Sequence, residues 1–207
     1  MSDSEVKRIA ARADLCRLLA ACYYQPGPEF AEEQVFDSMR VAAKQLDAGM
    51  ASLVDALAAA FDAQPIEELQ VDYTRLFLNP TGPLSAPYES VWLAGKDPML
   101  VKQVTQSVLD GYREGGYDVD VSFRDLPDHI AAELEFVYTL IFREARAVAT
   151  GNDAERQQAN DLRRRFVALH LGRWIGPFAE ALRDGCETAL YRALADLTER
   201  FVGSEAT

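Results

Sequence analysis

Two histidines are the residues of this chain best suited to acid–base or metal chemistry. His129 and His170 are the only histidines, and His129 follows Asp128 directly and precedes Glu133 by four positions. On a helix, positions i and i+4 share a face, so His129 and Glu133 would lie side by side. An imidazole beside a carboxylate can act as an acid–base pair or help to form a weak metal site. The same pattern also fits a structural histidine among carboxylates that cap a helix start.

Other catalytic and ligand-binding signatures are missing from the sequence. It contains no GxSxG, CxxC, HExxH, GxGxxG or GxxxxGK[ST] pattern. No motif therefore supports nucleophilic catalysis, a zinc site or a phosphate-binding loop. Cys16, Cys22 and Cys186 are an odd number without paired spacing, which favours buried free thiols. We therefore expect a non-enzyme without cofactor or metal. The alternative is a helical enzyme or metal-binding protein that uses His129 and Glu133.

A second unusual stretch, residues 73–92, combines aromatic side chains with prolines. Tyr73, Leu76 and Phe77 end a helical pattern, and segment 79–87 then holds three prolines and one glycine. Because proline lacks a backbone donor, this segment is predicted to be a loop. An apolar loop that leads to Trp92 must either cover the core or bind a peptide or small ligand between aromatic walls.

Helical periodicity predicts the elements that position these two stretches. Apolar residues recur at three- and four-residue steps along nearly the whole chain. Helix 127–149 is the most apolar, which predicts a central position, with Pro127 and Asp128 in its first turn. Residues 117–126 are expected to form an extended connection. The fold class is therefore all-α, a single-domain helical bundle of eight or nine helices over residues 1–207. The other predicted helices are 6–24, 29–46, 50–63, 66–78, 97–114, 153–171, 175–183 and 187–202.

Charge and hydropathy restrict the classes of partner. The 207 residues include 21 Lys+Arg and 33 Asp+Glu, a net charge of -12 that disfavours nucleic acid as a partner. Segment 118–135 contains six carboxylate side chains and one arginine. The basic run 163–165 is expected on a solvated face with ion pairs. The N-terminal segment is interrupted by charges and the longest uncharged apolar run is 136–142, so we expect a cytoplasmic protein without membrane insertion.

Two motifs follow one another along the chain. The first is Tyr73-x-x-Leu76-Phe77-x-x-Pro80 followed by Pro87-Tyr88-Glu89-Ser90-Val91. The second is Leu126-Pro127-Asp128-His129-Ile130 followed by Glu133-Leu134-Glu135-Phe136. In this order, in an acidic helical chain of this length, they resemble the TorD/DmsD/NarJ family of cytoplasmic maturation chaperones for molybdenum-containing redox enzymes.

The resemblance implies a function in molybdoenzyme assembly during anaerobic respiration. Family members bind the twin-arginine leader or the apo form of a redox enzyme precursor. They hold it until the molybdopterin cofactor is inserted, which delays export. A monomer or a homodimer, including a domain-swapped one, is compatible with the family. The resemblance implies a leader- or apoenzyme-binding surface formed by Tyr73, Leu76, Phe77, Pro80, Pro87, Tyr88, Glu89, Ser90, Trp92, Asp128, His129 and Glu133.

The chemistry of a twin-arginine leader agrees with this set of residues. Two arginines beside an apolar stretch require carboxylates next to an apolar groove. The candidate carboxylates are Glu89, Asp125, Asp128 and Glu133, and the candidate groove residues are Leu76, Phe77, Tyr88 and Trp92. A plain helical scaffold, with the aromatic loop as a dimer interface, is a further hypothesis.

Overall fold

The apolar periodicity produces an all-α fold, as predicted. The computed structural model describes residues 3–79, 82–118 and 125–206. In these ranges nine helices have eight or more residues, three helices are shorter, and the only strand-like pairing is an isolated antiparallel bridge between Tyr88 and His129. The elements are α1 (Asp3–Ala21), α2 (Glu29–Glu32), α3 (Val35–Ala43), α4 (Ala48–Asp62), α5 (Ile66–Tyr73), the π-helix η1 (Thr74–Leu78), α6 (Glu89–Ala94), α7 (Pro98–Gly115), α8 (Ile130–Thr150), α9 (Asp153–Leu169), α10 (Leu171–Gly185) and α11 (Ala189–Glu205).

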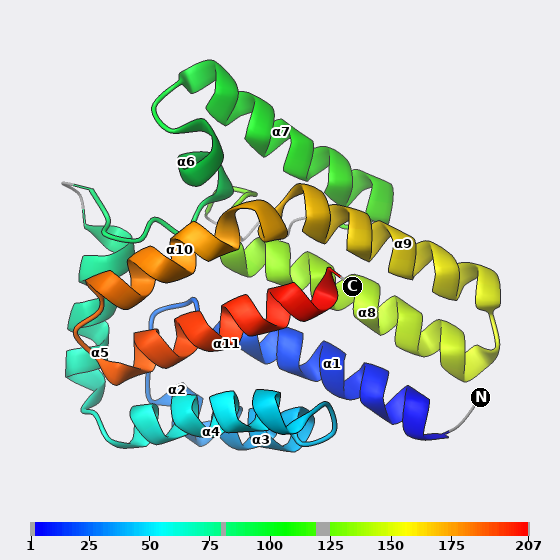
Figure 1. Cartoon of the computed structure of the whole chain (residues 1–207), viewed down its shortest axis with the longest axis horizontal. Coiled ribbons are helices and arrows are strands. Elements are labelled where there is room, and N and C mark those ends of the chain that lie inside the picture. The colour runs from blue at the N-terminus through cyan, green and yellow to red at the C-terminus, as the bar shows by residue number, and fades with distance from the viewer. Residues whose placement is uncertain (1–2, 80–81, 119–124, 207) are drawn as a thin grey trace.

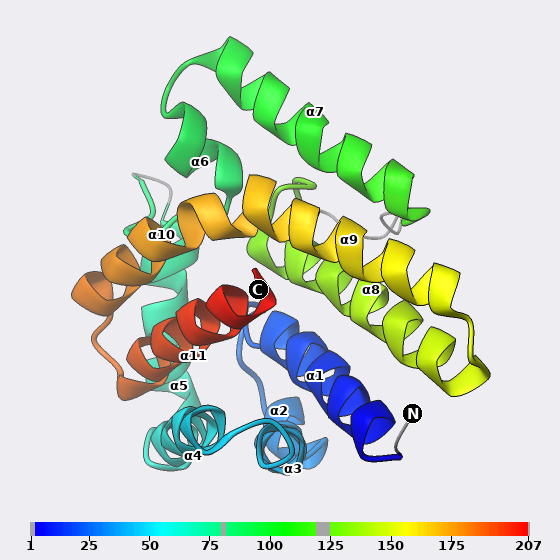
Figure 2. The same ribbon diagram turned by 45° about the vertical axis from the view of Figure 1, so that its right-hand side comes forward.

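Helix α8 lies at the centre of the bundle, which confirms the expectation from its apolar sequence. Figure 1 and Figure 2 show α1, α8 and α9 running side by side, while α11 packs between α4 and α10. Helices α6 and α7 lie on the outer side of α9 and α10. Aromatic rings fill the core between these layers, for example the T-shaped pair of Phe136 and Phe166, whose centroids are 4.7 Å apart.

Several predicted boundaries were wrong for local reasons. The expected helix 29–46 is divided into α2 and α3 because Gln34 adopts a left-handed conformation, with φ of 53°. Helix α10 begins at Leu171 rather than at residue 175 and contains Pro177. Helix α8 begins at Ile130 rather than at residue 127. The six-residue α6 was not predicted, and most of the expected extended connection lies outside the described residues.

The structure shows which of the cysteines and which residues of the basic run 163–165 are buried. All three cysteines are buried free thiols, as the sequence indicated. Arg163 is buried instead of solvated, and its guanidinium pairs with Glu205 at 2.6 Å. Arg165 does form a surface ion pair, with Glu114. Within the described ranges, no helix is long and apolar enough to cross a bilayer.

Candidate functional site

The two sequence motifs meet in space where α6 and α8 begin. The backbone N–H of Ile130 donates to the Pro87 carbonyl at 2.9 Å, and the N–H of Glu89 donates to the Asp128 carbonyl at 3.0 Å. These bonds flank the bridge between Tyr88 and His129. We call the paired segments 87–90 and 128–130 the junction. It joins two helix starts that are about 40 residues apart in the sequence.

Asp128 supplies the cap that α6 cannot provide for itself. Its side chain is fully buried, its Oδ2 accepts from the Ser90 N–H at 2.9 Å, and its Oδ1 accepts from the Thr105 hydroxyl at 3.3 Å. An aspartate oxygen commonly caps a helix by accepting from a backbone N–H that has no partner within the helix. Here the capping aspartate comes from a segment that is distant in the sequence. Asp128 therefore holds α6 and α7 against the start of α8.

His129 caps α8 rather than lying in its first turn. Its Nδ1 accepts from the Ala131 N–H at 3.1 Å, which requires an unprotonated nitrogen. Burial lowers the pKa of His129, although the negative charges of Asp125 and Asp128 act to raise it. The imidazole is thereby favoured in its neutral form, as a structural cap.

A buried polar cluster lies behind the junction. Glu89 contacts the His170 Nδ1 with its two oxygens at 3.0 and 3.1 Å. Glu133 is fully buried, and in the described parts of the chain its two oxygens have no hydrogen-bond partner, nor has the indole N–H of Trp174. Burial raises the pKa of Glu133 well above its ordinary range, and the charge of Glu89 raises it further.

This cluster does not form the acid–base pair considered from the sequence. His129 is bonded to the backbone, and Glu133 makes no hydrogen bond to it. Among the described residues, no group of three or more His, Cys, Asp or Glu side chains could hold a metal. The contacts of Asp128 and His129 instead organise the starts of α6 and α8.

The Tyr73–Phe77 motif lies beneath the proline-rich loop and not on the surface. Leu76 and Phe77 are in the π-helix η1, and the Leu76 carbonyl accepts from the Ser85 N–H at 3.0 Å. The Phe77 ring makes an edge contact with Tyr23, at a centroid distance of 6.2 Å. Burial raises the pKa of Tyr73 to about 12, with a contribution from the charge of Asp125. The motif therefore fixes the loop that leads to α6.

The exposed part of the site is a rim of residues around the junction. Tyr88 donates its hydroxyl to the Asp125 Oδ1 at 2.6 Å, and its ring meets His129 edge to face. Trp92 is half-buried and donates its indole N–H to the Ala86 carbonyl at 2.8 Å. We call the following set the rim: Tyr88, Val91, Trp92, Asp125 and Leu126.

The structure separates the sequence-predicted residues into two groups. The half-buried members are Tyr88 and Trp92, and Pro80 lies outside the described residues. The others are buried: Tyr73, Leu76, Phe77, Pro87, Glu89, Ser90, Asp128, His129 and Glu133. Of the four candidate carboxylates, only Asp125 faces solvent.

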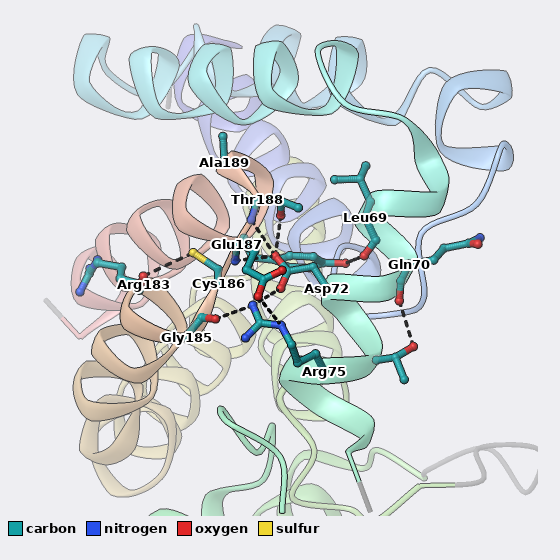
Figure 3. A network of polar contacts seen from close by, with 12 residues as sticks. Leu69, Gln70, Asp72, Arg75, Arg183, Gly185, Cys186, Glu187, Thr188 and Ala189 are labelled. Atoms are coloured by element: carbon teal, nitrogen blue, oxygen red, sulfur yellow. Dashed lines mark hydrogen bonds and ion pairs between the residues drawn. The ribbon is translucent and has the colours of Figure 1, made fainter.

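A second polar network, centred on Asp72, was missed by sequence reasoning. Figure 3 shows Asp72 between Arg75 and Thr188. Its Oδ2 accepts from the N–H groups of Glu187 and Thr188 at 3.0 and 2.8 Å and from the Thr188 hydroxyl at 2.8 Å. Its Oδ1 pairs with Arg75, which also donates to the Gly185 carbonyl. The only sign of this network in the sequence was the presence of Asp72 within an apolar helical pattern. Asp72 fixes the α10–α11 connection to α5.

Comparisons with known proteins agree with this architecture. The family model described as nitrate reductase delta subunit matches residues 43–180, more than half of the chain. The chain belongs to this family. The resemblance inferred from the two motifs is thereby confirmed, since relatives named chaperone protein TorD are also similar to the chain.

The similarity extends over most of the chain. The relative from Shewanella loihica is 27% identical over 203 residues, which cover 93% of this chain and 90% of the relative. The relative from Shewanella pealeana is 28% identical over 160 residues, which cover 74% of this chain and 66% of the relative. The fold is similar to a crystal structure from Archaeoglobus fulgidus, described as a candidate redox enzyme maturation protein. Its TM-score is 0.56 at 19% identity, with coverage of 92% of this chain and 93% of that one.

Proposed function

We propose that this nitrate reductase delta subunit family member is a maturation chaperone for a molybdopterin-containing oxidoreductase. It binds the twin-arginine leader, the apo form, or both, and holds the precursor until the cofactor is inserted. The proposed working form is a cytoplasmic monomer or homodimer without catalytic activity. The relatives named TorD chaperones support the general role.

The observation that carries the proposal is the convergence of the two motifs at one exposed rim. Asp125 offers a solvent-facing carboxylate beside the ring of Tyr88, and Val91 and Leu126 are exposed apolar neighbours. A carboxylate binds a guanidinium by charge-assisted hydrogen bonds, and an aromatic face adds a cation–π contribution. Apolar leader residues would pack on Trp92 and its neighbours.

The buried motif residues have a supporting role in this proposal. Asp128, His129 and Glu89 hold the two helix starts together through the junction and the contact with His170. A binding surface fixed in advance loses less conformational entropy when a peptide docks. We therefore place direct contacts with the client on the rim and assign its positioning to the buried residues.

Co-purification tests the proposal. The tagged chain is expressed in cells grown under anaerobic respiration with molybdate, and retained proteins are identified by mass spectrometry. We expect a molybdopterin oxidoreductase precursor to be retained by the wild type. Asp125→Asn should weaken its binding about tenfold, the loss expected for one charge-assisted contact. Asp62→Asn, an exposed change of the same kind in α4, is the matched control.

Two results would contradict the proposal. Absence of any such precursor from the retained proteins would refute the chaperone role. Equal affinity of the wild type and Asp125→Asn for the identified precursor would refute the placement of the contacts on the rim. Circular dichroism of each variant shows that a change in binding does not arise from unfolding.

A further inference from the structure

Outside the junction, the surface best suited to docking a peptide is a groove between α5 and the connection from α10 to α11. We infer that this groove is a second docking surface, which takes a basic segment of the client polypeptide with an apolar residue beside an arginine or lysine. The inference rests on the proposed function, because it names a second place where the same client is held. It concerns residues that neither motif includes.

The groove is preformed, and Val71 is the apolar residue in an otherwise polar lining. It has a volume of about 440 Å³ and lies between Glu67, Glu68 and Val71 on one side and Glu187 on the other. The Val71 side chain is 65% exposed, although α5 turns its opposite face, with Leu69 and Tyr73, into the core. An uncovered apolar side chain in a concave surface is a common feature of peptide-binding sites.

Charge complementarity identifies the occupant. Glu67, Glu68 and Glu187 are exposed at the edge of the groove. Within the described residues, Glu67 and Glu68 make no ion pair, and the guanidinium nearest to Glu187 is that of Arg75 at 3.5 Å. Arg75 is already bonded to Asp72 and to the Gly185 carbonyl. Acidic residues in the first turn also stabilise α5 through its dipole, but that effect does not require an exposed apolar side chain such as Val71 beside them.

The walls of the groove are fixed by hydrogen bonds. Asp72 holds the backbone of Glu187 and Thr188, as Figure 3 shows, and the Gln64 Oε1 accepts from the Ala189 N–H at 3.1 Å. These bonds tie the α10–α11 connection to both ends of the opposite wall. A rigid groove loses little conformational entropy on binding, so short peptides can be retained.

The groove lies beside the continuous helical segment that leads toward the junction. Helix α5 continues into η1, and Figure 1 shows α6 beyond the η1 end of this continuous segment. From Glu68 to Phe77 the helical rise is about 14 Å, which an extended peptide spans with about four or five residues. The groove therefore lies within a short peptide's reach of the end of η1, where the loop to α6 begins.

Fluorescence anisotropy with the full chain tests the inference. The probe is a fluorescein-labelled peptide, Gly-Arg-Arg-Phe-Leu-Gly, at low salt. We expect E67Q/E68Q to weaken binding about fivefold to tenfold, because two exposed charge contacts are lost. Val71→Gln should weaken it about threefold through the lost apolar contact. The matched control is E32Q/E33Q, which makes the same charge change at exposed positions around α2.

The outcomes separate this inference from the proposed function. Weaker binding by E67Q/E68Q, with E32Q/E33Q unchanged, supports the groove. Binding within twofold of the wild type, an equal effect of the control, or no binding of the probe by the wild type overturns the groove as a docking surface. Retention of the client precursor by the wild type in the co-purification then shows that the chaperone role stands by itself. Loss of that retention refutes the chaperone role instead.

Discussion

The buried Glu133 carboxyl should control how the stability of this protein changes with pH. Burial raises its pKa well above the ordinary value of 4.5, and the charges of Glu89 and Asp128 act in the same direction. The folded protein therefore retains a proton that the unfolded chain releases at lower pH. Glu133→Gln replaces this carboxyl by a neutral amide of similar shape, which does not titrate.

The magnitude follows from the linkage between proton binding and folding. Below about pH 4.5 both states are protonated at Glu133, and its contribution to stability is fully present. As the pH rises toward the raised folded pKa, the free energy of unfolding of the wild type falls by about 1.4 kcal/mol per pH unit. Glu133→Gln lacks this titration, so its advantage over the wild type should grow with the same slope.

Urea unfolding followed by circular dichroism, at pH values from about 5 to about 8, measures this difference. The control is Glu144→Gln in the same helix. Glu144 is also buried but pairs with Arg12, so its substitution should destabilise the protein at neutral pH. A constant difference between Glu133→Gln and the wild type across the range would refute the assignment of a buried, protonated carboxyl.

Four further substitutions, one of them a control, test other parts of the structure by the same unfolding assay. Asp72→Ala should lose about 2–4 kcal/mol, because buried donors are left without an acceptor; a loss below about 1 kcal/mol would contradict its bridging role. Gly115→Ala places a Cβ 2.4 Å from a phenylalanine ring of α8 and should lose about 1–3 kcal/mol. Gly203→Ala, which meets open space, should be neutral or slightly stabilising. Arg163→Met should lose about 3 kcal/mol, since Glu205 loses a buried partner, and an unchanged midpoint would argue against that pair.

The sequence predicted the long helices well because each has an apolar face that repeats over several turns. It failed where a distant residue decides the local conformation. Helix α6 has six residues, too few for a periodic pattern, and its first turn is capped by Asp128 from 38 positions away. The helix predicted over 175–183 begins earlier, at Leu171, and the buried side chains of Trp174 and Phe178 lie on either side of Pro177 within it. Gln34 divides a predicted helix without any glycine or proline to signal it.

The candidate site shows a different limit of sequence reasoning. Residues of the two motifs lie together in the structure, where they form the junction. Residue type could not predict which carboxylates face water, because that depends on how α6, α8 and α10 pack. Glu89, Asp128 and Glu133 became internal, and Asp125 remained exposed. Asp72 was not recognised because its partners, Glu187 and Thr188, lie more than 100 residues later.

The junction also determines when α6 can form during synthesis of this protein. A six-residue helix is unstable alone, so α6 has to wait until the ribosome has delivered Asp128 and the start of α8. Helix α1 waits as well, because its principal packing partner is α8. Such late, long-range closure slows folding and leaves the first 100 or so residues with exposed apolar faces while translation continues. We therefore expect this chain to need protection from aggregation during its own synthesis.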